Sequence, residues 1–153
     1  MDIVGPLDID IIIKLSFSFF LGLIVGIERE FAGKEAGPRT YSLVSLGVTL
    51  FTVLALDPRF GGEGATRIIS QIIPGIGFIG AGLIIFHQSR VHGLTTAAGI
   101  WSMAAIGIAV GMGYYVISIF VTLLSLMVLY LFRRFDIEDR IHRLASIKEE
   151  KKH

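Results

Sequence analysis

The sequence contains no cysteine, few charged residues and only four prolines. The absence of cysteine excludes disulfide bonds and thiolate metal sites, although it does not identify a compartment. Charged residues make up 18% of the chain, whereas a soluble domain usually carries about a quarter. The charges are clustered, and long apolar runs lie between them. Together with a mean hydropathy of +0.72, this pattern predicts an integral membrane protein.

The two ends of the chain are expected to behave differently. The N-terminus is acidic and lacks the basic region and cleavage site of a secretory signal, so the first apolar segment should stay in the mature protein. We expect one membrane domain over residues 1–132 and a charged cytosolic tail over 133–153. Ile137, Ile141, Leu144 and Ile147 give the tail a helical stripe. The tail is either a solvated helical extension, an inner-leaflet helix or a docking segment for a copy of itself or a partner.

Five apolar segments approach the length of about 20 residues that a helix needs to cross a bilayer. The second is short and would need extension into its flanks, and the last two are separated only by Gly111-Met-Gly113. The sequence therefore predicts an all-α protein with five transmembrane helices. They are expected at Ile9–Ile27, Tyr41–Leu56, Ile68–Phe86, Leu94–Met112 and Tyr114–Phe132.

The distribution of Lys and Arg predicts the orientation in the membrane. With the N-terminus outside, the inner segments carry three, one and seven basic residues, and the outer segments carry only Arg59 and Arg67. Basic residues accumulate on the cytoplasmic side of membrane proteins. We therefore expect an N-terminus outside and a C-terminus in the cytosol.

The segment from Ser70 to Phe86 is uncharged and unusually rich in glycine. A glycine in a soluble helix costs about 1 kcal/mol relative to alanine, whereas in a bilayer it lets helices approach closely. This predicts a buried helix, kinked at Pro74, with neighbours packed tightly around Gly75, Gly77, Gly80 and Gly82. The stretch matches G-x-G-x-x-G formally, but it lies inside an apolar run, so we exclude a dinucleotide site.

Two further small-residue pairs and one charged pair lie within the apolar segments. Gly22-x-x-x-Gly26 and Gly107-x-x-x-Gly111 each indicate close helix packing, within the chain or between subunits. Packing within the chain is favoured for both. Asp10 and Lys14 are four residues apart and are expected to form a local ion pair.

Several polar residues near the membrane are candidates for function. Glu28 is expected to turn inward and pair with Arg39 or Arg29, either as a structural ion pair or as part of a functional site. Thr95 and Thr96 either cap the fourth helix or line a polar path together with Gln71.

The residue types that carry catalysis do not occur in a recognisable arrangement. We find no nucleophile–base pair, no phosphate-binding loop and no catalytic carboxylate pair, so we expect neither an enzyme nor a nucleic-acid-binding protein. His87 and His92 lack nearby acids and make a poor metal site. No cofactor is expected. The acidic residues Asp57 and Glu63 could attract Mg²⁺ weakly, without a recognised ligand spacing.

Four stretches together resemble the membrane domain of the MgtC/SapB family. They are G-L-I-V-G-I-E-R-E (Gly22–Glu30), A-G-P-R-T (Ala36–Thr40), P-G-I-G-F-I-G-A-G (Pro74–Gly82) and G-L-T-T-A-A-G-I-W (Gly93–Trp101). Each motif is weak alone, and their order makes the set specific. The resemblance extends the list of candidate residues to Glu28, Arg29, Arg39, Thr40, Gln71, Pro74, Gly75, Gly77, Gly80, Gly82, Thr95, Thr96 and Trp101.

The resemblance implies a five-helix protein of the inner (plasma) membrane. Members of this family are associated with adaptation to magnesium limitation and with survival of pathogens inside host cells. One member is described as restraining the ATP synthase through contact within the membrane. Many relatives carry a cytosolic ACT-type domain. Only a short tail follows Phe132 here, so regulation through such a domain is expected to be absent or supplied by another protein.

Two functions follow as hypotheses. The first is a regulatory membrane protein that acts through helix contacts with itself, as a homo-oligomer such as a dimer, or with a membrane complex such as the ATP synthase. The second is a small oligomeric transporter or channel for a divalent cation such as magnesium. A broken, glycine-rich helix at Pro74 and an inward Glu28 would favour the second hypothesis.

Overall fold

A computed structural model describes residues 6–57, 64–87 and 90–134. Within these residues the chain forms five helices and one two-stranded hairpin. The helices are α1 (Pro6–Phe31), α2 (Pro38–Leu56), α3 (Ala65–Leu83), α4 (Leu94–Gly111) and α5 (Tyr115–Arg134), and the strands are β1 (Ile85–His87) and β2 (Arg90–His92). The predicted helical tail from residue 135 onward lies outside the described residues.

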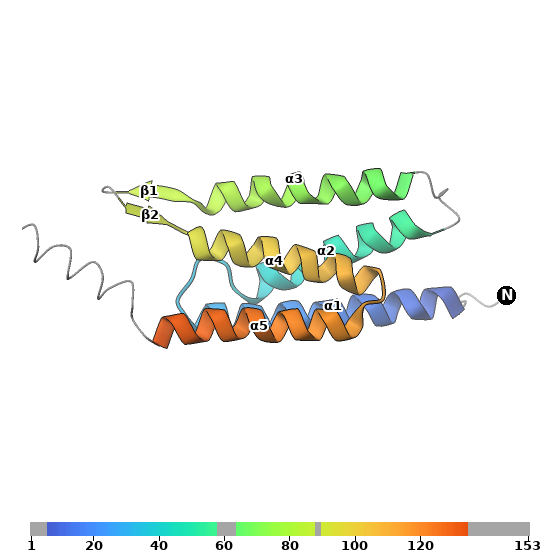
Figure 1. Ribbon diagram of the computed structural model, residues 1–153, viewed down its shortest axis with the longest axis horizontal. Coiled ribbons are helices and arrows are strands. Elements are labelled where there is room, and N and C mark those ends of the chain that lie inside the picture. Colours follow the sequence, from blue (N-terminus) through green and yellow to red (C-terminus); the bar gives the residue numbers. More distant parts are fainter. Residues whose placement is uncertain (1–5, 58–63, 88–89, 135–153) are drawn as a thin grey trace, which may run out of the picture.

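The helices form an elongated bundle in which α2 and α4 lie in the middle (Figure 1). α1 and α5 cover one side of this pair, and α3 covers the other side. The β-hairpin projects beyond the helices at the end of the bundle where α1 and α5 end and α2 and α4 begin. We refer to this end as the hairpin end.

Four of the described helices are long and apolar enough to cross a membrane: Leu7–Phe31, Pro38–Leu56, Thr66–Leu83 and Leu94–Gly111. The apolar part of α5, Tyr115–Leu131, is shorter. The chain is therefore a multi-pass membrane protein. The predicted extension of the second segment is confirmed, because α2 begins at Pro38, and proline is well suited to the first turn of a helix.

The centre of the bundle is α2, which close-packed glycines hold between α1 and α4. A Cβ atom built on Gly22 of α1 would lie 2.7 Å from the Tyr41 carbonyl oxygen, and one on Gly26 would collide with the Pro38 backbone. On the other side, a Cβ on Gly107 of α4 would lie 3.1 Å from the Ser45 carbonyl oxygen. The prediction that both glycine pairs pack within the chain is confirmed.

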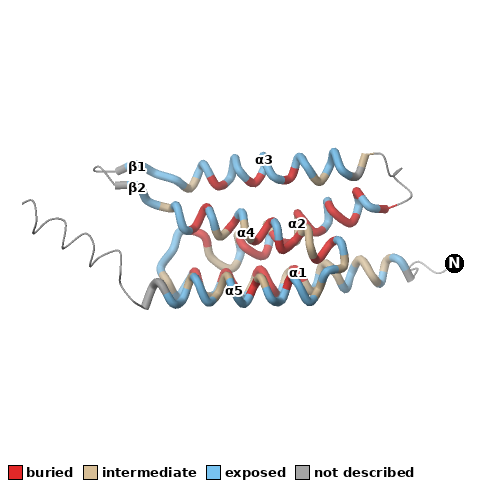
Figure 2. The backbone as a smooth tube through the Cα atoms, in the orientation of Figure 1, coloured by how far each residue is buried: buried red, intermediate tan, exposed pale blue. Residues whose placement is uncertain are grey.

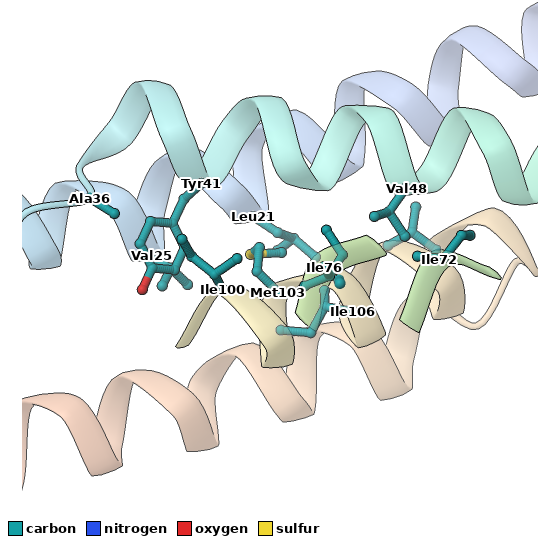
Figure 3. Close-up of a cluster of buried hydrophobic side chains, with 12 residues drawn as sticks. Leu21, Val25, Ala36, Tyr41, Val48, Ile72, Ile76, Ile100, Met103 and Ile106 are labelled. Carbon is teal, nitrogen blue, oxygen red and sulfur yellow. The ribbon is translucent and has the colours of Figure 1, made fainter. Parts of the chain in front are cut away.

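The core follows this arrangement. Buried apolar side chains from four helices meet between α1, α2, α3 and α4, where Tyr41 and Ile100 are fully enclosed (Figure 3). The other members labelled in the figure are Leu21, Val25, Ala36, Val48, Ile72, Ile76, Met103 and Ile106.

The expectation that the glycine-rich helix is buried with tight neighbours is wrong for α3. This helix lies at the side of the bundle and packs mainly on α4 and α2, so most of its residues are exposed (Figure 2). A Cβ on Gly75, Gly77 or Gly82 would meet no atom within 4 Å, and one on Gly80 would make only ordinary contact with Ala97, at 3.7 Å. The helix runs through Pro74 as one element.

The expected helical end of the third segment is also wrong, because Ile85 and Phe86 belong to β1. The strand pairs antiparallel with β2, and Phe86 lies opposite Val91. The run Ile84-Ile85-Phe86 consists of β-branched and aromatic residues, which favour extended backbone. Gly93 then turns the chain into α4 with φ = 83°, a conformation that favours glycine.

The predicted tight connection between the last two helices is confirmed. α4 ends at Gly111, Gly113 has φ = 84°, and α5 begins at Tyr115. The predicted ion pair near the start of α1 is confirmed as well, with 2.7 Å between Lys14 Nζ and Asp10 Oδ2.

The packing of α1 on α2 predicts that Gly22→Ala lowers the free energy of unfolding by about 1–3 kcal/mol, since the new methyl group meets backbone that cannot move aside. The measurement is reversible unfolding in mixed detergent micelles. Gly77→Ala is the matched control, because its methyl group meets nothing within 4 Å. Equal effects of the two substitutions would contradict the close-packing interpretation.

Candidate functional site

Polar side chains from three helices and one loop gather at the hairpin end of the bundle. Glu28 and Arg29 belong to the last turn of α1, Glu35 to the connection between α1 and α2, Tyr41 to the start of α2 and Thr96 to the first turn of α4. Two of the stretches that carry the family resemblance, Gly22–Glu30 and Gly93–Trp101, therefore meet here, and Glu35 and Tyr41 flank a third, Ala36–Thr40.

Arg29 is the buried charge of this cluster. Its side chain is only 2% exposed, because it continues the inward face of α1 that includes Val25. Its Nε donates a hydrogen bond of 2.5 Å to Glu28 Oε2, and its Nη2 forms an ion pair with the same oxygen. Glu28 was expected to pair with Arg39 or Arg29, and in the structure it pairs with Arg29. Among the described residues no ion pair involves Arg39, which is exposed.

Thr96 connects α4 to both α2 and the α1–α2 connection. Its hydroxyl donates a hydrogen bond of 3.0 Å to Glu35 Oε2, and its carbonyl oxygen accepts one of 3.4 Å from the Tyr41 hydroxyl. The expectation that Thr95 and Thr96 cap α4 is wrong, since the N-cap residue is Gly93 and no side chain caps it. The Tyr41 hydroxyl occupies space next to Gly99, where a Cβ atom would collide with it.

Glu35 is an exposed carboxylate outside the membrane-spanning helices. Its own backbone N–H and the Thr96 hydroxyl donate hydrogen bonds to it, and these bonds lower the pKa of its carboxyl group below its ordinary value of 4.5. The charged form of Glu35 therefore favours the folded arrangement of this connection.

A second polar cluster lies within the bundle, formed by Ser18 of α1 with Ser45 and Thr49 of α2. Ser18 Oγ lies 2.6 Å from Ser45 Oγ and 2.7 Å from Thr49 Oγ1, and Thr49 Oγ1 also lies 3.0 Å from the Gly107 carbonyl oxygen of α4. The Ser45 hydroxyl donates a hydrogen bond of 2.9 Å to the Ser18 carbonyl oxygen, and the one hydrogen of the Thr49 hydroxyl can be donated either to Ser18 Oγ or to the Gly107 carbonyl oxygen. This hydroxyl chain joins three helices and satisfies its members away from water.

The remaining candidate residues lie elsewhere. Thr40 is half-buried beside Arg39, and Thr95 and Trp101 are exposed on α4. Gln71, Pro74, Gly75, Gly77 and Gly82 are exposed on α3, whereas Gly80 is buried against α4. The structure therefore brings together Glu28, Arg29 and Thr96 in one region and does not bring them to Gln71. Their functional roles stay predictions.

Two hollows lie between the helices. One, of about 280 Å³, lies between α1, α4 and α5, and Thr95, Ser102 and Ser125 are among its lining residues. The other, of about 560 Å³, lies between α2 and α3 and includes Gln71. Both are lined mainly by apolar side chains. Within the described ranges no group of three or more His, Asp or Glu side chains could hold a metal ion.

The sequence analysis missed Glu35, Tyr41, Ser18, Ser45 and Thr49. A signal for three of them was present, because Tyr41, Ser45 and Thr49 recur, together with Thr52, at helical spacing on one face of an apolar segment. The central position of Ser18 in the first span was a further signal. Glu35 gave no signal, since its partner is 61 residues away in the chain.

Comparison with known proteins assigns the chain to a family. The sequence profile described as the MgtC family matches residues 15–137, which is most of the chain. This chain belongs to the MgtC family. The predicted family resemblance is confirmed, and the matched residues 15–137 include both polar clusters described above.

Among its relatives, the chain is 39% identical over 132 residues to the "Putative magnesium transporter YhiD" of Escherichia coli (strain K12), covering 82% of this chain and 61% of the relative. It is 42% identical over 99 residues to "Protein MgtC" of Brucella abortus (strain 2308), covering 65% and 41%. It is 35% identical over 117 residues to "Protein SapB" of Bacillus subtilis (strain 168), covering 71% and 50%. The chain thus spans about half the length of these relatives. No solved structure matches it significantly.

The hydroxyl chain predicts an energetic coupling between α1, α2 and α4. Thr49→Val should lower the free energy of unfolding by roughly 0.5–2 kcal/mol, and its effect should shrink when Ser18 is already alanine. Unfolding of the two single variants and the double variant in mixed micelles measures this. Thr122→Val is the control, because the Thr122 hydroxyl bonds only the Ser118 carbonyl of its own helix. Additive effects of Ser18→Ala and Thr49→Val would refute the coupling.

The lowered pKa of Glu35 predicts a pH dependence of stability. A carboxyl group whose pKa is lower in the folded state stabilises the fold above its unfolded-state pKa, near 4.5, and loses this contribution as the pH falls through the folded-state pKa. Between about pH 5 and about pH 3, the unfolding temperature of the wild type should fall more than that of Glu35→Gln. Thr96→Val leaves the backbone hydrogen bond of Glu35 in place, so its pH dependence should lie between those of the wild type and Glu35→Gln. Glu30→Gln, which removes an exposed carboxylate nearby, should retain the wild-type dependence.

Proposed function

We propose that the protein is a regulatory membrane protein of magnesium homeostasis, active in adaptation to low magnesium or intracellular stress, which acts through contacts with other proteins in the bilayer. Membership of the MgtC family supports the link to magnesium, and so does the similarity to a putative magnesium transporter. The relatives include a putative magnesium transporter and proteins named MgtC and SapB, so the choice between regulation and transport is argued from the geometry of the interior.

The single observation that carries the proposal is the pairing of polar groups inside the bundle. Arg29 is paired with Glu28, and the three central hydroxyls bond one another and the Gly107 carbonyl. A transport path needs polar groups that are available to a passing ion, with sites that bind it and release it. Among the described residues the buried Ser42 hydroxyl has no hydrogen-bond partner, whereas the groups named above bond one another. Interior groups that satisfy one another in this way favour a rigid scaffold, whose outer surface makes the functional contacts.

We propose the predicted topology together with this function. The fifth helix would cross the membrane with its apolar part, Tyr115–Leu131, extended by the basic residues that follow. Five spans place the two ends of the chain on opposite sides, and the distribution of Lys and Arg favours an outside N-terminus in the inner membrane. The hairpin end, with its charged cluster, would then face the cytosol.

The partner would be a membrane complex, and the ATP synthase is the candidate that the family resemblance suggests. Exposed apolar helices offer large surfaces for such contacts, and small residues on them permit close approach. The polar cluster at the hairpin end would hold the ends of α1, α2 and α4 in place, so that these surfaces keep their shape.

The alternative is an oligomeric transporter for a divalent cation. The observation that favours it is the row Asp10, Lys14 and Ser18, which are four residues apart on α1 and lead from its first turns to the hydroxyl chain. Such polar groups within a span are expensive in lipid and are often functional.

Reconstitution separates the two functions. Purified full-length protein in liposomes with an enclosed magnesium indicator should give no saturable Mg²⁺ flux above that of empty liposomes, and a membrane complex should co-purify with the tagged protein from its host. Saturable flux that Glu28→Gln abolishes would overturn the regulatory proposal. Thr122→Val is the control variant, since it removes only a hydrogen bond from the Thr122 hydroxyl to the Ser118 carbonyl oxygen of the same helix.

A further inference from the structure

The outward face of α3 carries residues that the protomer itself does not use. Ile72, Ile76 and Gly80 face the bundle and are buried. Gln71, Gly75, Phe78 and Gly82 follow one another at helical spacing on the exposed side. The Phe78 side chain is 82% exposed. It protrudes from this face because Gly75 and Gly82, which lie on the same side of the helix, have no side chains.

An apolar groove of about 560 Å³ runs next to this face, between α3 and α2. Leu43, Gly47 and Phe51 form its α2 wall, and Ile68, Gly75 and Ile79 belong to its α3 wall. A Cβ atom on Gly47 or Gly75 would meet nothing within 4 Å, so the groove is open at both glycines. The same surface therefore carries a protruding aromatic ring and, beside it, an open groove.

Gln71 lines this groove and requires a polar partner. It is the seventh residue of α3, which places it about 9 Å along a helix that spans the membrane. Its amide is exposed, and it makes no hydrogen bond with another residue in the described part of the chain. Lipid tails cannot accept or donate hydrogen bonds, and an unsatisfied polar group in hydrocarbon costs several kcal/mol.

We propose that a second copy of this chain covers the groove, so that two α3 helices form the centre of a homodimer in the membrane. A two-fold interface places the same patch on both subunits, which requires a surface that is complementary to itself. The Gln71 amide contains both a donor and an acceptor, so two copies can satisfy each other. Phe78 of each copy fills the groove beside α3 of the other.

This surface goes beyond the proposed function, which concerns contacts with other membrane complexes. A symmetric pair explains three features at one position: the polar amide in the span, the exposed ring and the glycines that receive no neighbour from their own chain. A lipid-covered face would explain the exposed ring but would leave the Gln71 amide without a partner.

The first test is a matched pair of substitutions. Gly75→Leu places a side chain in the groove, whereas Gly77→Leu places the same side chain on α3 outside the groove lining. Neither position has a neighbour within 4 Å in its own chain, so both variants should fold with the helical content of the wild type. Gly75→Leu should raise the dimer dissociation constant in lipid nanodiscs or detergent at least about tenfold, and Gly77→Leu should leave it within about twofold.

The second test uses the absence of natural cysteines. In native membranes, oxidation of Gln71→Cys should yield a covalent dimer of the full chain, because the two Gln71 side chains meet in the proposed pair. Phe120→Cys, an exposed residue at similar depth on α5, should yield none. The proposal is overturned if the α3 and α5 cysteines cross-link equally, if neither does, or if the α3 cysteine forms a product with a protein of another mass.

Discussion

The close approach of α2 to both of its neighbours is the constraint on which the rest of the fold depends. Gly22 and Gly26 admit the α2 backbone on one side, and Gly107 admits it on the other. At this spacing the short hydroxyls of Ser18, Ser45 and Thr49 reach across two interfaces, which longer side chains would hold apart. In a membrane, where apolar burial between helices contributes little, packing and hydrogen bonds of this kind provide the association energy.

The sequence was sufficient to predict the elements but not all of their neighbours. Apolar length and composition identified every helix to within a few residues, and the glycine pairs in the first and fourth helices identified real contacts. The same reasoning was wrong for α3. A glycine pattern indicates that another helix can approach closely, but it does not identify a helix of the same chain that does so. The β-hairpin was missed because a run such as Ile84-Ile85-Phe86 is equally apolar in a helix or a strand.

The candidate site could be predicted only in part, for a related reason. Charges next to an apolar segment are visible in a sequence, so Glu28 and Arg29 were identified as candidates. Arg29 was one of the two partners expected for Glu28, and the structure pairs these two residues. Glu35 and Tyr41 depend on Thr96, which lies more than 50 residues further along the chain. A single sequence carries no information on which distant segments meet, so the role of Thr96 as the link between α2, α4 and the α1–α2 connection required the structure.

The one-sided packing of α3 has a consequence for how the protein is assembled. The chain is inserted from its N-terminus, so α1 and α2 can pair as soon as both are in the bilayer. α3 follows them, but its buried residues Ile72 and Ile76 face a site that α4 completes only later. During that interval α3 has only its contacts with α2 and its connections to hold it, and it reaches its final place only after α4 has followed it into the bilayer.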